Sequence, residues 1–396
     1  MSFHDTTVQT GRRAKATGPR ILTLQFILGA VLIFEAPFPG VPGNIPGQNF
    51  AAAALVLMGL FRRPGWRISR FRSFVPYWAA LIVYLVVESM INEVDWTRRA
   101  IRLVLMVALA AQLGTGRLDI RSVLWGLMTG MILNIPLFYL HLTQDQYDGY
   151  LTGFLNDKNV AGLYYALIPI LLTVLVKKRN SRLLLIAIGV GATFLTGSRT
   201  ALAALLLALV WVVVTKRLGP SLQLPFLLLL YFSEQFIEER FASSGLLGDR
   251  AGTDQLRGWI ADASWNLVHQ TPWYGGGLGQ ATVQVIGKTW FFHDSYLALY
   301  REGGWIALIG VAGFLLVIGL RLFGGGRALV PVAFEAGAVI TLICASKLGE
   351  VFLAMPTFIL LGCLFMSRNS SVLADSIRLR ASSSDAPESE PRIHER

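Results

Sequence analysis

Four ionisable side chains of three kinds stand close together in the segment Trp290–Trp305, directly before a long apolar run. They are His293, Asp294, Arg301 and Glu302. Histidine exchanges a proton near neutral pH, so His293 is a candidate general base. If a helix begins near His293, Asp294 and Arg301 lie on one of its faces. Ionisable groups where a chain enters a membrane are costly unless they have partners or a task there.

A structural role also fits this segment. Asp294 or Ser295 would cap the helix, Glu302 would pair locally, and the neighbouring aromatic residues would form the belt found at membrane interfaces. Taken residue by residue, the two interpretations stay open. The cluster as a whole favours a function.

The composition is that of a polytopic membrane protein. The chain is 54% hydrophobic and only 15% charged, and apolar runs recur along its length. The net charge is +11, but Lys and Arg are concentrated in short connectors and tails, as the positive-inside rule expects. This distribution excludes a basic nucleic-acid-binding face. Cys344 and Cys363 both lie in apolar runs, which favours buried small side chains over a disulfide or a metal site.

The apolar runs predict an all-α fold, a polytopic transmembrane helical bundle of about twelve spans in the cytoplasmic membrane, with both termini inside. Residues 1–20 form a cytoplasmic lead, 21–232 hold spans 1–9, 233–292 form an extracytoplasmic loop with short amphipathic helices, 293–366 hold spans 10–12, and 367–396 form a disordered cytoplasmic tail. The predicted spans are Ile21–Phe34, Asn49–Phe61, Val75–Ile91, Arg99–Leu113, Ser122–Leu142, Val160–Val176, Leu183–Leu195, Thr200–Val214, Ser221–Phe232, Asp294–Leu320, Ala328–Ala345 and Leu348–Met366.

Two more arginines are predicted on the same, outer side as His293. Arg199 ends the tight turn Thr196–Arg199, where the positive-inside bias disfavours a basic residue; snorkelling to the headgroups is the structural alternative. Arg257 lies in Asp254–Trp265, whose spacing is typical of an amphipathic helix on a membrane surface, and such a helix needs basic residues in any case.

The segment Thr271–Gly279 has four glycines in five positions. Glycines allow close backbone approach and exposed N–H groups, which suit an anion, although a flexible turn is the commoner use. No Asp-x-Asp pair and no His/Cys ligand spacing occurs in the sequence, so no metal or other cofactor is expected. Arginines bind phosphate oxygens in bidentate fashion, so arginines beside a histidine indicate chemistry on a phosphorylated lipid.

Four sequence pieces, in order between about residues 150 and 310, resemble the O-antigen ligase/polymerase superfamily of bacterial integral membrane glycosyltransferases. They are Gly153–Ala161 with its asparagine before the next span, Thr196–Leu202 with its Ser-Arg turn, Arg257–Trp259 followed by Pro272–Gly279, and His293–Leu297 with Glu302-Gly303. The first 150 residues match only in hydropathy. Asp294 stands where the family commonly has Asn, and Lys158 stands where ligases often have Pro, which puts the subfamily in question.

The resemblance implies that a glycan moves from an undecaprenyl-diphosphate carrier to an acceptor hydroxyl without a metal. It implies His293 as the general base and Arg199 and Arg257 as the diphosphate-binding residues. Glu302 would orient His293 or pair with Arg301 or Arg199. The weaker candidates for site residues are Arg301, Asp294, Asn159 and Lys158.

The expected partners are a lipid-linked glycan donor, a glycan or glycolipid acceptor, membrane lipids, and other polysaccharide-assembly proteins. A ligase and a polymerase would share the donor, the site and the fold, so the sequence leaves both open. A transporter for lipid-linked glycans is the alternative outside this class. It predicts repeated halves with paired charges in mid-membrane, whereas Glu88, Arg102 and Glu335 are scattered and follow no repeat. A purely structural scaffold would leave the outer arginines and histidine unexplained.

Overall fold

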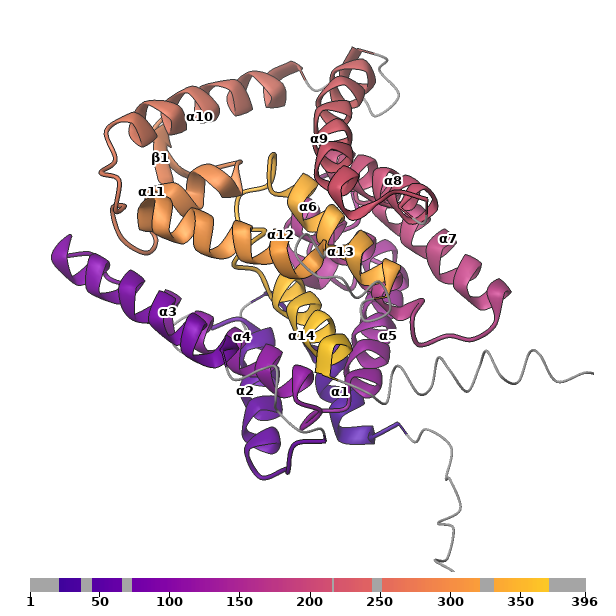
Figure 1. Cartoon of the computed structure of the whole chain (residues 1–396). Helices are drawn as coiled ribbons and strands as arrows, with labels where there is room; N and C mark the ends of the chain where they lie inside the picture. Colours follow the sequence, from indigo (N-terminus) through magenta and orange to yellow (C-terminus); the bar gives the residue numbers. More distant parts are fainter. Residues whose placement is uncertain are drawn as a thin grey trace, which may run out of the picture.

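The computed structural model describes residues 21–36, 45–65, 73–215, 217–243, 251–320 and 331–369. Within these ranges the chain is mostly helical, with one two-stranded antiparallel hairpin (Figure 1). The predicted cytoplasmic lead and nearly all of the predicted disordered tail lie outside the described residues. The helical fold class predicted from the sequence is confirmed.

A helix lies at the position of each predicted span. Of these, α3 (Phe74–Ile91), α5 (Ile120–Tyr139) and the helical segment Ser295–Gly319, which is kinked at Gly303–Gly304, are long and apolar enough to cross a membrane. Helix length and composition alone therefore support three crossings rather than twelve. The helices that coincide with spans are α1 (Thr23–Val31), α2 (Gly47–Leu60), α3 (Phe74–Ile91), α4 (Thr97–Gly114), α5 (Ile120–Tyr139), α6 (Lys158–Leu172), α7 (Arg179–Leu195), α8 (Arg199–Val214), α9 (Pro220–Ser243), α11 (Ser295–Leu308) continued by the π-helical turn η2 (Ile309–Gly313) and α12 (Phe314–Gly319), α13 (Val332–Cys344) and α14 (Met355–Asn369).

Small residues let the helices pack closely. A Cβ at Gly126 or Gly130 of α5 would come within 2.0 or 2.5 Å of a carbonyl oxygen of α1. Such small residues are a usual means of bringing helices together when both faces are apolar. One large apolar core joins most of the helices, and it includes fully buried Trp78 and Trp211.

The segment predicted as the long outer loop contains one long helix, α10 (Ala251–His269), and the hairpin of β1 (Thr282–Val285) and β2 (Lys288–Phe291). Ile260 and Val268 of α10 pack into a second, smaller core with Phe292. The predicted amphipathic helix is present, but the hairpin was not predicted. Its sequence signal is the alternation of residues 282–285 before Ile286-Gly287, both of which have positive φ.

Several connections between helices lie together at one end of the helices. This end, here called the polar end, includes the segments around Glu35, Leu151–Phe154, Leu195, Ser295 and Ala345. Glu35 after α1 bonds through its N–H to Phe154 before α6, at 2.9 Å. Leu151 likewise donates to the carbonyl of Leu195 at the end of α7, at 2.9 Å. Ser295 at the start of α11 donates to Ala345 after α13, at 2.8 Å. Segments far apart in the sequence therefore combine at this end.

Candidate functional site

His293 is held between the hairpin and α11. Phe292 is 1% exposed, and its N–H donates to the carbonyl of Ala281 at 3.1 Å. The carbonyl of Phe292 lies against Gly349, where an added Cβ would come within 2.0 Å of the oxygen. Phe292 is therefore buried, hydrogen-bonded through its N–H and packed against Gly349 through its carbonyl, which fixes the backbone next to His293.

Asp294 has the capping role that the sequence allowed for it. Its carboxylate accepts the N–H groups of Tyr296 and Leu297 at 2.7 and 2.9 Å, as an N-cap does. Burial raises the pKa of Asp294 to about 6, and these two hydrogen bonds and Lys347 oppose the rise. Ser295 continues the anchor, since its Oγ accepts the N–H of Val351 at 2.8 Å.

Charges from two other elements act on His293. Burial lowers its pKa below the ordinary value, Arg257 of α10 lowers it further, and Asp157 acts in the opposite direction. The structure thus brings His293 and Arg257 into electrostatic range of each other. A neutral imidazole is the form that can accept a proton, and both main influences favour it.

Asp157 begins α6 and orders the segment around Lys158. Its carboxylate accepts the N–H groups of Asn159 and Val160 at 2.7 and 3.0 Å and the hydroxyl of Tyr147 at 2.7 Å. The Lys158 ammonium lies 5.1 Å from the centre of the Tyr147 ring, within cation–π range. Burial raises the pKa of Tyr147, Asp157 adds to the rise, and Arg257 opposes it.

The predicted turn of Arg199 is present, and Asn159 is its neighbour in space. Helix α7 ends at Leu195 and α8 begins at Arg199. The Oγ of Ser198, one residue earlier, donates to Oδ1 of Asn159 at 3.5 Å. Gly162 permits this approach, because a Cβ there would meet the Ser198 side chain at 2.7 Å. Two segments predicted as separate outer connectors, Thr143–Asn159 and Thr196–Arg199, are therefore in contact through Asn159 and Ser198.

Glu302 has a different partner from those expected. Its carboxylate is 4% exposed and forms an ion pair with Arg99 of α4 at 2.9 Å, instead of pairing with Arg301 or Arg199. It also accepts the N–H of Gly279 at 3.0 Å. Arg99 starts the fourth predicted span, about 200 residues earlier in the sequence, so no local pattern indicated this pair.

The glycine-rich segment binds α11 instead of presenting its N–H groups to a ligand. Gly276 and Gly277 donate to the carbonyls of Arg301 and Glu302 at 2.8 and 3.0 Å. Arg301 itself donates to Oγ1 of Thr271 at 3.0 Å. The close backbone approach that these glycines allow is confirmed. The carbonyls of α11 already accept the N–H groups of Gly276 and Gly277, so these two donors are not presented to an anion.

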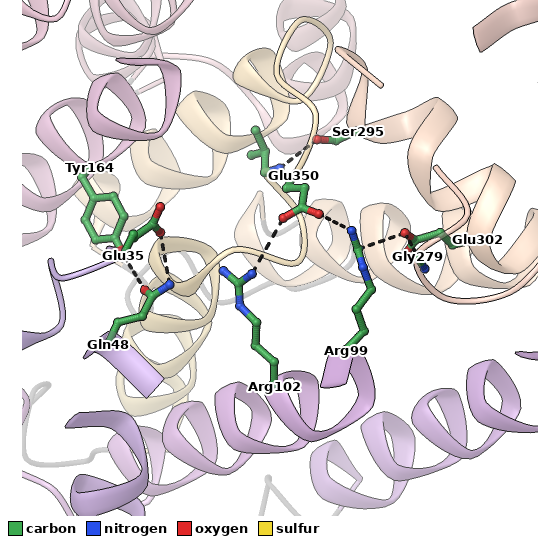
Figure 2. A network of polar contacts seen from close by, with 10 residues as sticks. Glu35, Gln48, Arg99, Arg102, Tyr164, Gly279, Ser295, Glu302 and Glu350 are labelled. Carbon is green, nitrogen blue, oxygen red and sulfur yellow. Dashed lines mark hydrogen bonds and ion pairs between the residues drawn. The ribbon is translucent and has the colours of Figure 1, made fainter. Parts of the chain in front are cut away.

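Sequence reasoning missed a network of arginines and acids beside this segment. Figure 2 shows Arg99 and Arg102 extending from α4 toward the carboxylate of Glu350. The nitrogen–oxygen distances are 2.5 Å for Arg99 and 3.8 Å for Arg102. The i, i+3 spacing of the two arginines was the available signal, because it places both on one helical face.

The network continues toward α1 through Glu35. Its carboxylate accepts from Nε2 of Gln48 at 3.3 Å, and Figure 2 shows this pair beside Tyr164. Burial raises the pKa of Glu35 to about 7, and Arg102 counters the rise. A carboxyl with this pKa changes charge near neutral pH, and such groups are frequent at functional sites.

A small, partly open pocket lies between the network and the hairpin, with a cavity volume of about 20 Å³. Its lining includes Arg99, Glu302, Glu350, Phe291 and Phe292. Among the described residues no group of three or more His, Cys, Asp or Glu is arranged to hold a metal ion.

Comparison with protein-family models and with curated proteins finds no match to this chain. The resemblance to the ligase/polymerase superfamily therefore rests on the sequence motifs alone.

Proposed function

We propose that this chain is a membrane glycosyltransferase of the O-antigen ligase/polymerase type. It transfers a glycan from a polyprenyl-diphosphate carrier to an acceptor hydroxyl, in the assembly of a cell-envelope polysaccharide. The observation that carries the proposal is the effect of Arg257 on His293, whose pKa it lowers, at the polar end. The contact between Asn159 and Ser198 also holds the turn before Arg199 against the start of α6 at this end.

The chemistry needs one base and fixed positive charge. His293 takes the proton from the acceptor hydroxyl, and the acceptor oxygen forms a bond to the anomeric carbon of the donor glycan. The bond from that carbon to the diphosphate oxygen breaks, and the electron pair leaves with the polyprenyl diphosphate. Arg257 and Arg199 bind the diphosphate and stabilise the charge that develops on it. This division of roles needs no metal.

The proposed membrane arrangement has twelve spans, with the polar end outside and both termini inside. Its support is the charge distribution at the opposite helix ends. The connectors there are rich in basic residues, including Arg62, Arg117, Lys178 and Arg217, and cytoplasmic connectors carry such an excess. The proposed location is therefore the cytoplasmic membrane, with the site on its extracytoplasmic face.

The test uses the full chain, purified in lipid nanodiscs, with a polyprenyl-diphosphate-linked glycan and an acceptor glycan. His293→Gln should keep donor binding while its single-turnover rate falls by about 100-fold or more, the usual contribution of proton transfer. Arg257→Lys should weaken donor binding and slow turnover, because a point charge does not replace a bidentate fork. His269→Gln changes an exposed histidine at the end of α10 and is the matched control.

Transfer by wild type and its loss in His293→Gln, with His269→Gln active, would support the enzyme. Flipping of the labelled lipid across a vesicle membrane, without any glycosyl transfer, would instead establish the transporter alternative. The product separates the two enzyme types, because a ligase joins the glycan to a different acceptor and a polymerase extends the same glycan.

A further inference from the structure

We propose that the pocket between Arg99, Glu350 and Phe291 is the subsite for the acceptor, and that it takes an uncharged sugar residue. This inference rests on the proposed transferase function. The proposed mechanism gives no role to the Arg99–Arg102–Glu350 network, and this inference assigns that network to binding of the acceptor.

The lining has the two kinds of group that bind sugars. Glu350 is 36% exposed at its side chain, so its carboxylate oxygens remain accessible to hydroxyl donors beside the two arginines. Phe291 is 56% exposed and has Arg99 about 5.8 Å from its ring centre. An exposed aromatic ring next to fixed hydrogen-bonding groups offers an apolar surface to the C–H face of a sugar and polar contacts to its hydroxyls.

The balance of charge argues for a neutral ligand here. Arg99 and the acids Glu302 and Glu350 line the pocket, and Arg102, which lies beside it, pairs with Glu350. The two positive and two negative charges of this network therefore compensate one another. The His293 side of the polar end differs, because among the described residues Arg257, Lys158 and Arg199 outnumber the carboxylates of Asp157 and Asp294 there. The diphosphate of the donor suits the cationic side, and an uncharged acceptor suits the compensated side.

The pocket is also next to the proposed base. Phe292 lines it and is bonded directly to His293 along the chain, which puts their Cα atoms about 3.8 Å apart. Ser295 lines it as well. The pocket is therefore lined by residues on both sides of His293 in the chain, one and two positions away.

The size of the cavity defines how a sugar fits. A volume of about 20 Å³ holds one water-sized group, so a hydroxyl or hydroxymethyl enters while the ring stays outside against Phe291. The pocket thus selects the position of one substituent on the acceptor residue.

The test measures binding separately from transfer. The probe is a set of fluorescently labelled neutral oligosaccharides, released from the host cell's own envelope polysaccharide, with inorganic diphosphate as the anionic probe. Binding to the full chain in nanodiscs is followed by fluorescence anisotropy and, for diphosphate, by calorimetry.

Phe291→Ala and Glu350→Gln should each weaken oligosaccharide binding about 10-fold or more and leave diphosphate binding unchanged. Trp265→Ala and Asp262→Asn alter an exposed aromatic and an exposed acid of α10 and serve as matched controls.

Phe291→Ala removes a ring at the surface, so it reports on the subsite even if Glu350→Gln disturbs folding. The inference is overturned if no oligosaccharide binds to wild type, or if Phe291→Ala binds as wild type does. Failure of the proposed function gives a different result, because glycosyl transfer would then be absent while oligosaccharide binding still depended on Phe291.

Discussion

Two charged residues shift the pKa of His293 in opposite directions, and the direction of each shift can be tested. Arg257 lowers its pKa and Asp157 raises it, while burial lowers it most. As the catalytic base it must be neutral, so activity should fall on the acid side of its pKa. The acid limb of kcat/KM for the wild type should therefore have its midpoint below the ordinary value of 6.5.

Replacement of Asp157 by Asn should move this acid limb to still lower pH. The substitution removes the charge that raises the pKa of His293, and asparagine still caps α6. The measurement is the pH profile of kcat/KM for both proteins, with Asp95→Asn as an exposed-acid control. A shift toward higher pH would show that Asp157 does not act on the base in this way.

Asp294 caps α11, and its raised pKa makes the stability of the protein depend on pH. It lies just before the span Ser295–Gly319, and burial raises its pKa to about 6. The folded state therefore holds its proton more tightly than the unfolded chain does, whose Asp has an ordinary pKa of 3.8. By linkage, the free energy of unfolding contributed by this group falls as pH rises from about 4 to about 6.

Asp294→Asn should keep the cap without the buried charge. We expect the variant to be more stable than wild type at pH 7.5, by on the order of 1 kcal/mol, and the difference to shrink at pH 4.5. Thermal unfolding at the two pH values measures this. A variant that is less stable at pH 7.5 would mean that the carboxylate stabilises the folded state through other contacts.

At the scale of elements, the junction between α11 and the glycine-rich segment is tightly constrained. Gly304 has a φ of +61°, and a Cβ there would lie 2.0 Å from the carbonyl oxygen of Trp273. That carbonyl accepts the N–H of Trp305 at 3.0 Å. The kink in α11 therefore fixes the position of residues 273–279, and through Gly279 the position of Glu302.

Gly304→Ala should break this junction. The positive φ and the backbone clash together should cost roughly 2 kcal/mol or more of unfolding free energy. Hydrogen exchange of residues 271–281 should rise, because their N–H groups lose partners on α11. Gly191→Ala on α7, where a Cβ meets nothing within 4 Å, is the matched control and should be neutral or slightly stabilising. Equal protection of 271–281 in both variants would contradict the role of the junction.

For the whole molecule, the two ends of the helices differ in the distribution of charged residues. The polar end carries the candidate site, and the opposite end carries the basic connectors. If the positive-inside rule sets the orientation, the polar end faces outward. The buried state of Cys344 and Cys363 makes the protein suitable for a labelling test, since both native thiols are protected from reagent.

Single cysteines at two exposed positions should report this orientation. Asn266→Cys on α10 should react with a membrane-impermeant thiol reagent on intact cells, whereas Asn180→Cys at the start of α7 should react only after permeabilisation. Mass spectrometry of the labelled protein gives the extent of reaction. The opposite pattern would invert the proposed topology and put the site on the cytoplasmic side.

The amino-acid sequence alone determined the helical class, the places of the apolar helices and the turn before Arg199, and it limited the cap before Leu297 to Asp294 or Ser295. These features depend on composition, periodicity and neighbours within a few residues, all of which are visible in the chain itself.

Only the tertiary structure decided the partners of the polar groups. Arg99 and Glu302 are about 200 residues apart in sequence, and Glu350 comes from a third segment. Likewise, the sequence allowed the glycine N–H groups to bind an anion, whereas in the structure those of Gly276 and Gly277 donate to carbonyls of α11. Buried charges and donors need partners, and many residues in the chain qualify for each. Which one is chosen depends on how the helices pack, because packing alone determines which side chains come within hydrogen-bonding distance.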